Sequence, residues 1–155
     1  MIKSKDLAKA LTDLIKIRAG LPLKVFFNHV NNSSESYAWV RLRPMKRDEG
    51  FGYMQRRIRV DIQIVLAPDE HGEVKHTDIL DCIDKLDEAT CNSIPVLDRW
   101  LVILDTETII FDDIGTYSFQ LDFTDCISTL PPELSEAEYM RQLELDFEGY
   151  EIVEG

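Results

Sequence analysis

The sequence predicts an α+β fold, in which a two-layer domain packs a mostly antiparallel sheet of about five strands against two helices on one face. Apolar residues recur at helical spacing over residues 7–15 and 79–86. They alternate with polar residues over 58–66 and 117–123, as in half-buried strands. Strands with one polar face bury the other face under helices, which favours two layers. A chain of 155 residues builds one such core without disulfides or metal.

Capping residues set the expected ends of the two helices. Ser4 is placed to cap the first helix and Gly20 to end it, and Thr77 is placed to cap the second. The expected buried stripes are Leu7, Leu11, Leu14 and Ile15 in the first helix and Ile79, Leu80, Ile83 and Leu86 in the second.

Three strands are expected between the helices. Residues 23–30 and 37–43 are rich in Val, Phe, Tyr and Trp, and the polar stretch between them predicts a hairpin. A long loop with Pro44, Gly50 and Gly52 then leads to the clearest strand, 58–66.

Two more strands and a terminal arm complete the chain. Residues 100–110 and 116–128 flank the turn-like Asp112-Asp113-Ile114-Gly115 and predict a second hairpin. Residues 1–130 therefore form the domain, and Pro131-Pro132 opens a C-terminal helical or extended arm over 131–155. The arm holds eight acids against Arg141 alone, which is typical of a segment that a partner orders.

Charge is distributed unevenly along the chain. The net charge of −12 argues against general affinity for duplex DNA or anionic membranes. Residues 1–66 carry 13 basic and 6 acidic side chains, whereas residues 67–155 carry 4 and 23. If the halves expose their charges on different faces, the basic face of one copy complements the acidic face of the next. Two ordinary solvated faces are the alternative.

The sequence offers little for catalysis. The order of elements is that of restriction-endonuclease-like nucleases, whose metal site needs an acid on one strand and an acid followed two residues later by Lys on the next. Strand 37–43 has no acid, Gln63 stands in the Lys position after Asp61, and Thr108 and Ile109 follow Asp105 and Glu107. We therefore expect no enzyme activity.

Metal and cofactor sites are also not expected. His71 and His76 lie near several acids, but polar loops commonly collect such residues, and His29 has no nucleophile partner. The glycines form no phosphate-binding pattern. Three cysteines without a CxxC motif and an N-terminus without a signal peptide indicate synthesis in the cytoplasm, and no apolar run approaches the roughly 18 residues of a membrane helix.

A basic cluster is the most informative candidate site. Tyr37 and Trp39 share strand parity with its first members, which also allows a platform for single-stranded nucleic acid. The negative net charge favours a surface that faces protein, and a plain solvated face is the remaining alternative. The cluster consists of Arg41, Arg43, Lys46, Arg47, Arg57 and Arg59.

Several stretches, in this order, resemble the tail-terminator or tail-completion proteins of long-tailed bacteriophages. They are the amphipathic helix at 7–15 and the segments KVFFNHV, YAWVRLRP, RRIRVDIQIVL, HTDILDCIDKLDEA and YSFQLDFTDCIS. The likeness is one of pattern and order over residues 3–128 and includes no diagnostic motif. The acidic arm departs from a minimal member, which keeps a related head–tail joining or neck role open.

The resemblance implies a structural virion protein of the phage tail or neck. Its subunits would form a ring, expected to be a hexamer, on the last ring of the tail tube protein, stop tail polymerisation and present a surface to the head–tail connector protein. A closed ring of heterologous contacts suits a charge-polarised subunit. An acidic lumen would let DNA pass without sticking. An adaptor domain and, less favoured, a metal-dependent nuclease are the alternatives.

Removal of the arm tests the domain boundary. Truncation after Thr129 is expected to leave the melting temperature of the domain nearly unchanged, because the arm contributes little to the expected core. Thermal unfolding of the full and truncated chains measures this, and a large drop would place the arm in the core.

Overall fold

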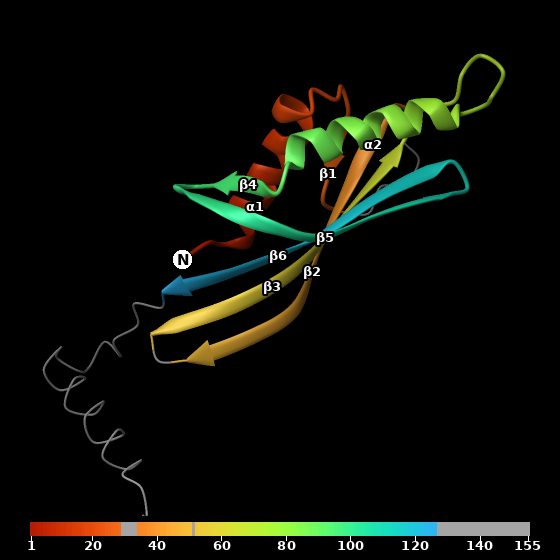
Figure 1. Cartoon of the computed structure of the whole chain (residues 1–155). Helices are drawn as coiled ribbons and strands as arrows, with labels where there is room; N and C mark the ends of the chain where they lie inside the picture. The colour runs from red at the N-terminus through yellow and green to blue at the C-terminus, as the bar shows by residue number, and fades with distance from the viewer. Residues whose placement is uncertain (29–33, 51, 127–155) are drawn as a thin grey trace, which may run out of the picture.

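The computed structural model describes residues 1–28, 34–50 and 52–126, with 46–50 described for the backbone only. It confirms the α+β class, with one mixed sheet of six strands and the helices on one of its faces (Figure 1). In chain order the elements are α1 (Ser4–Asp13), the π-helical turn η1 (Leu14–Arg18), β1 (Lys24–Phe26), β2 (Tyr37–Gly50), β3 (Tyr53–Val65), α2 (His76–Thr90), β4 (Ser93–Val96), β5 (Arg99–Phe111) and β6 (Ile114–Cys126).

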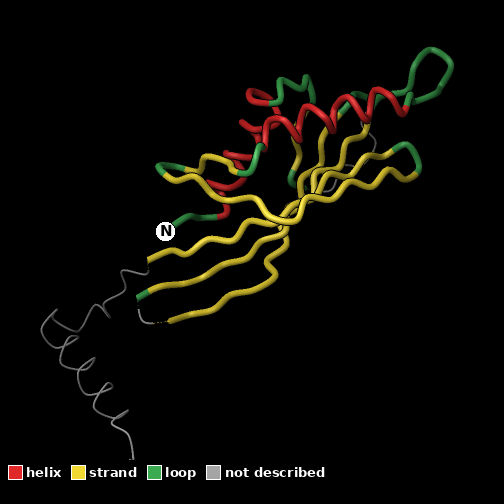
Figure 2. The backbone as a smooth tube through the Cα atoms, viewed as in Figure 1, coloured by secondary structure: helices red, strands yellow, loops and turns green. Residues whose placement is uncertain are grey.

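The strands lie in the order β1-β2-β3-β6-β5-β4. β1 runs parallel to β2, and every other neighbouring pair is antiparallel. Long β2, β3 and β6 form the middle of a twisted, curled sheet (Figure 2). The sheet therefore has a helix-covered face and an open face.

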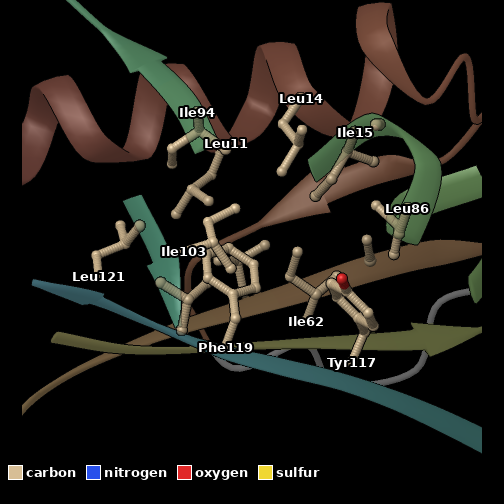
Figure 3. Close-up of a cluster of buried hydrophobic side chains, with 14 of the residues drawn as sticks. Leu11, Leu14, Ile15, Ile62, Leu86, Ile94, Ile103, Tyr117, Phe119 and Leu121 are labelled. Carbon is tan, nitrogen blue, oxygen red and sulfur yellow. The ribbon is translucent and has the colours of Figure 1, made fainter. Parts of the chain in front are cut away.

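The core lies between the helices and the sheet (Figure 3). The predicted stripe of the first helix is buried throughout, and its last two residues belong to η1. In the second helix Ile79, Ile83 and Leu86 are buried, but Leu80 is 46% exposed, so its predicted place in the core was wrong. The strands contribute side chains that alternate along β3 and β6, including Ile58, Val60, Ile62, Ile64, Tyr117, Phe119, Leu121 and Phe123.

The predicted hairpin of the first two strands was wrong. β1 is only three residues long and pairs in parallel with β2, Lys24 opposite Tyr37 and Phe26 opposite Trp39. A tight turn cannot connect parallel strands. The ten residues between Phe26 and Tyr37 give the chain the length to return in the same direction.

The predicted long loop after Pro44 is a continuous hairpin instead. β2 pairs with β3 from Tyr37 opposite Val65 to Gly50 opposite Tyr53. A register shift between Pro44 and Lys46 accommodates the proline, which an edge strand tolerates because its N–H side needs no partner. Gly52, at φ +69°, permits the tight turn.

Smaller differences concern element ends and one extra strand. Ser4 and Thr77 lie inside their helices, and the caps are Lys3, whose N–H donates to Asp6 Oδ2 at 2.8 Å, and Lys75. The sequence did not predict β4, because four residues that include a proline give a weak strand pattern. The second hairpin is confirmed by β5 and β6, and the predicted arm lies outside the described residues.

The N-terminal segment is fixed to the end of the sheet. Buried Asp125 accepts a hydrogen bond from the Ile2 N–H at 3.1 Å and pairs with Arg99 at 2.6 Å. Arg56 Nη1 donates to the Ile2 carbonyl at 2.7 Å. These contacts join β3, β5 and β6 to the start of α1.

Close packing of α2 on β6 gives a prediction about Gly115. A Cβ at this position would overlap the Ile79 side chain. Gly115→Ala is therefore expected to lower the free energy of unfolding by about 1–3 kcal/mol. Urea unfolding measures this, with Gly72→Ala as a control that meets no neighbour but has a positive φ. An unchanged free energy of unfolding in Gly115→Ala would contradict close packing at Gly115.

Candidate interaction surface on the open sheet face

The open face collects most of the predicted basic cluster. Strand alternation turns Arg41 and Arg43 of β2, and Arg57 and Arg59 of β3, away from the buried positions between them. Arg43 lies opposite Arg59 in register. The side chains of Lys46 and Arg47 are outside the described residues, although the backbone places them opposite Arg57 and Arg56.

Asp61 of β3 is the centre of a polar network on this face. Its side chain is 3% exposed. Arg43 lies 2.7 Å from Oδ2, and Oδ1 accepts from Arg59 Nε at 3.2 Å and from the Ser118 hydroxyl at 2.7 Å. One carboxylate thus connects β2, β3 and β6. The sequence pointed to Asp61 only as an incomplete metal ligand, because its partners on β2 and β6 become neighbours only in the sheet.

The surroundings keep Asp61 ionised. Burial raises its pKa, but the hydrogen bonds from Ser118 and Arg59 and the charge of Arg43 outweigh burial and lower the pKa below its ordinary value of 3.8. Hydrogen bonds to Glu107 and Asp61 raise the pKa of Arg59. The network is therefore charged at neutral pH.

Other carboxylates pair with the remaining arginines. Arg59 Nη2 contacts Glu107 of β5 at 2.9 Å. Arg57 contacts Asp122 of β6 at 2.7 Å, which also accepts from Gln55 at 3.1 Å. Three of the four described arginines thus have internal acidic partners, and this part of the cluster is a mixed ionic surface. Arg41 instead stacks on Trp39 at 4.9 Å and forms no ion pair with a described residue.

Exposed apolar side chains form a row along β5, beside this network. The sequence patterns did not indicate this row. Before the register shift between Leu104 and Glu107, its members alternate with the buried Leu101 and Ile103. The remaining two members follow the shift. Exposed apolar rows of this kind mark contact surfaces. The row consists of Trp100, 65% exposed, Val102, 54%, Leu104, 38%, Ile109, 52%, and Phe111, 73%.

Besides the short outer strands β1 and β4, two long strands have uncovered edges within the described part of the chain. β1 pairs with β2 only at Tyr37–Trp39, so β2 has no outer neighbour from Val40 onward. β4 pairs with β5 only at 99–102, so β5 has none from Leu104 to Phe111. These edges lie on opposite sides of the sheet.

The described residues hold no group of three His, Cys, Asp or Glu side chains placed to bind a metal. His76 Nε2 lies 2.8 Å from Asp113 of the β5–β6 turn, and no contact joins it to His71. Within the described ranges, no helix is long and apolar enough to cross a membrane.

Comparisons with known proteins leave the family open. No family model matches the sequence, and no curated protein is significantly similar to it. A solved structure whose name states no function shares 16% identity over 81% of this chain and 93% of its own, with a TM-score of 0.41. That overlap is too weak to support an argument.

The Asp61 network predicts a pH-dependent contribution to stability. Because folding lowers its pKa, the stabilisation is complete above the unfolded value of 3.8 and is lost as pH falls through the lower folded value. Asp61→Asn is expected to reduce the free energy of unfolding by about 1.5–3 kcal/mol at pH 7 and by much less at pH 2.5. Urea unfolding at both pH values tests this, and a pH-independent difference would contradict it.

Proposed function

We propose that this chain is a non-enzymatic structural subunit that associates head to tail into a ring. In line with the tail-terminator resemblance, the ring caps the tail tube of a long-tailed phage, ends tail polymerisation and provides the surface for head–tail joining. Its partners are further copies of itself, the tail tube protein and the connector protein, and DNA only passes through its lumen.

The order of strands in the sheet carries this proposal. β1, β2 and β3 come from the basic half of the sequence and lie on one side, while β6, β5 and β4 come from the acidic half and lie on the other. The two uncovered edges therefore belong to halves of opposite net charge. The basic edge of one copy therefore attracts the acidic edge of a second copy. Because the two copies contribute different surfaces, the contact is heterologous.

A heterologous contact closes into a ring when the rotation between copies divides a full turn. The resemblance suggests six copies. The apolar row on β5 and the mixed ionic surface then supply contacts within the ring or with the tube.

The nuclease alternative is disfavoured by the contacts of Asp61. Arg43, Arg59 and Ser118 occupy both carboxylate oxygens that a divalent metal would need. Asp105 and Glu107 lie on β5 in an exposed stretch, where Arg59 contacts Glu107.

Assembly is the direct test of the proposal. We expect light scattering at high protein concentration to show a large species at low salt and less of it at high salt, because opposite charges attract across the contacts. Negative-stain imaging should show six-fold rings, and added protein should bind the ends of purified tail tubes. A protein that remains monomeric and ignores tubes would contradict the proposal and favour an adaptor domain.

The arginines of the open face can be tested within the same assay. Reversing Arg57 and Arg59 to Glu should weaken assembly and reduce its dependence on salt. Because the variant loses the contacts with Asp122 and Asp61, its melting curve must show that it is folded before weak assembly counts for the interface. Reversal of Lys9 and Lys16 on the exposed side of the first helical segment is the matched control. Unchanged assembly of the arginine variant would remove these residues from the interface.

A further inference from the structure

The uncovered edge of β5 is protected only in its first part, where a register shift lies between Leu104 and Glu107. Asp105 and Glu107 add charge to that first part, whereas the last residues of the strand, Thr108–Phe111, include no proline and no charge and are rich in β-branched side chains. Natural proteins usually protect exposed edges with prolines, charged side chains or bulges, or they cover the edge with another element. The reason is that unpaired N–H and C=O groups at an open edge can pair with another strand. Exposed Ile109 and Phe111 flank this edge. This part of the edge is therefore suited to pair with a strand of another molecule.

The uncovered edge of β2 lies on the other side of the sheet and has a short segment able to receive a strand. Pro44 and the register shift beside it interrupt the edge, which leaves Val40–Arg43 as regular strand before the interruption. Trp39 and Arg41 stack on the open face at this point. The aromatic ring and the aliphatic part of Arg41 offer apolar contact next to a charge.

Two charges at these edges form no close ion pair among the described residues, although the charge of Asp105 acts at longer range on Arg57 of the same chain. Arg41 of β2 has a buried Nε that no described atom accepts. Asp105 of β5 is exposed and lies at the register shift with φ +50°. Glu107, two residues away, is already paired with Arg59. Opposite unpaired charges on opposite edges of one sheet complement each other between copies and not within one copy.

We infer that the β5 edge of one copy pairs with the β2 edge of the next copy, which continues the sheet across the subunit boundary and brings Arg41 near the Asp105 of its neighbour. This inference rests on the proposed head-to-tail association and names the surfaces that form it. Backbone hydrogen bonds would align the two strands. The exposed side chains of Ile109 and Phe111 would add buried apolar area to the contact, which a few backbone hydrogen bonds do not provide.

Charge exchange in the full chain tests the contact. Arg41→Glu and Asp105→Arg should each raise the apparent dissociation constant of assembly by about tenfold, because each puts like charges together. An equimolar mixture should regain assembly. When the two variants alternate, one boundary joins the native Asp105 to the native Arg41. The next boundary joins the two introduced residues, which again have opposite charges. Lys9→Glu and Glu70→Arg, both at exposed positions outside the two edges, are matched controls.

Each outcome of this experiment decides between the two proposals. If both variants form rings as well as wild type, or if the mixture fails to recover, the edge-to-edge contact is wrong while ring formation stands. A wild-type chain that neither assembles nor binds tubes overturns both. Melting curves of the variants show that they are folded, which excludes loss of structure as the cause of weak assembly.

A disulfide experiment checks the contact without relying on charge. Arg41→Cys and Asp105→Cys chains are mixed, oxidised and digested, and the linked peptides are identified by mass spectrometry. A bond between positions 41 and 105 of different chains is expected, since strand neighbours lie within disulfide range. Dominant 105–105 bonds would instead indicate a symmetric contact between two β5 edges and overturn the inference.

Discussion

The sheet depends on a single buried carboxylate at its centre. Asp61 is bound by Arg43 from the strand on one side, by Ser118 from the strand on the other and by Arg59 from its own strand. A buried charge is tolerated only when opposite charges and donors surround it. The open face can therefore be polar over its middle strands, while the side chains on the other face of these strands pack in the core. The arginines are held in place by the same contacts and are not free to act as a bare basic patch.

Local patterns in the sequence predicted what depends on near neighbours. Strict alternation over 58–66 and 117–123 identified β3, β6 and their buried side chains, and helical spacing identified α1 and most of α2. Leu80 was misplaced because a stripe of four apolar positions does not tell which member lies at the edge of the contact. The α+β class and the helix-covered face followed from these patterns.

What depends on distant partners could not be read in the same way. The parallel pairing of β1, the extension of β2 past Pro44 and the small strand β4 are set by which strand comes to lie alongside. The clustering of the four arginines was predicted from strand parity. The partners of two of them were not, because Asp122, which pairs with Arg57, lies 65 residues further along the chain, and Glu107, which pairs with Arg59, lies 48 residues further. The apolar row on β5 was hidden within a strand whose two faces both contain apolar residues.

The pairing of β3 with β6 has a consequence for how the chain folds. These central neighbours span residues 53–65 and 114–126, so the ladder that joins the two halves closes a loop that contains α2, β4 and β5. Proteins dominated by such non-local pairings fold slowly, because loop entropy is lost before the contacts compensate for it. During synthesis, α1, η1 and the first three strands emerge before β6, so the inner edge of β3 has no partner until β6 leaves the ribosome. In that interval the nascent chain holds most of the protein's positive charge, because residues 1–66 carry 13 of the 17 basic side chains, and it becomes acidic only as the later half is made.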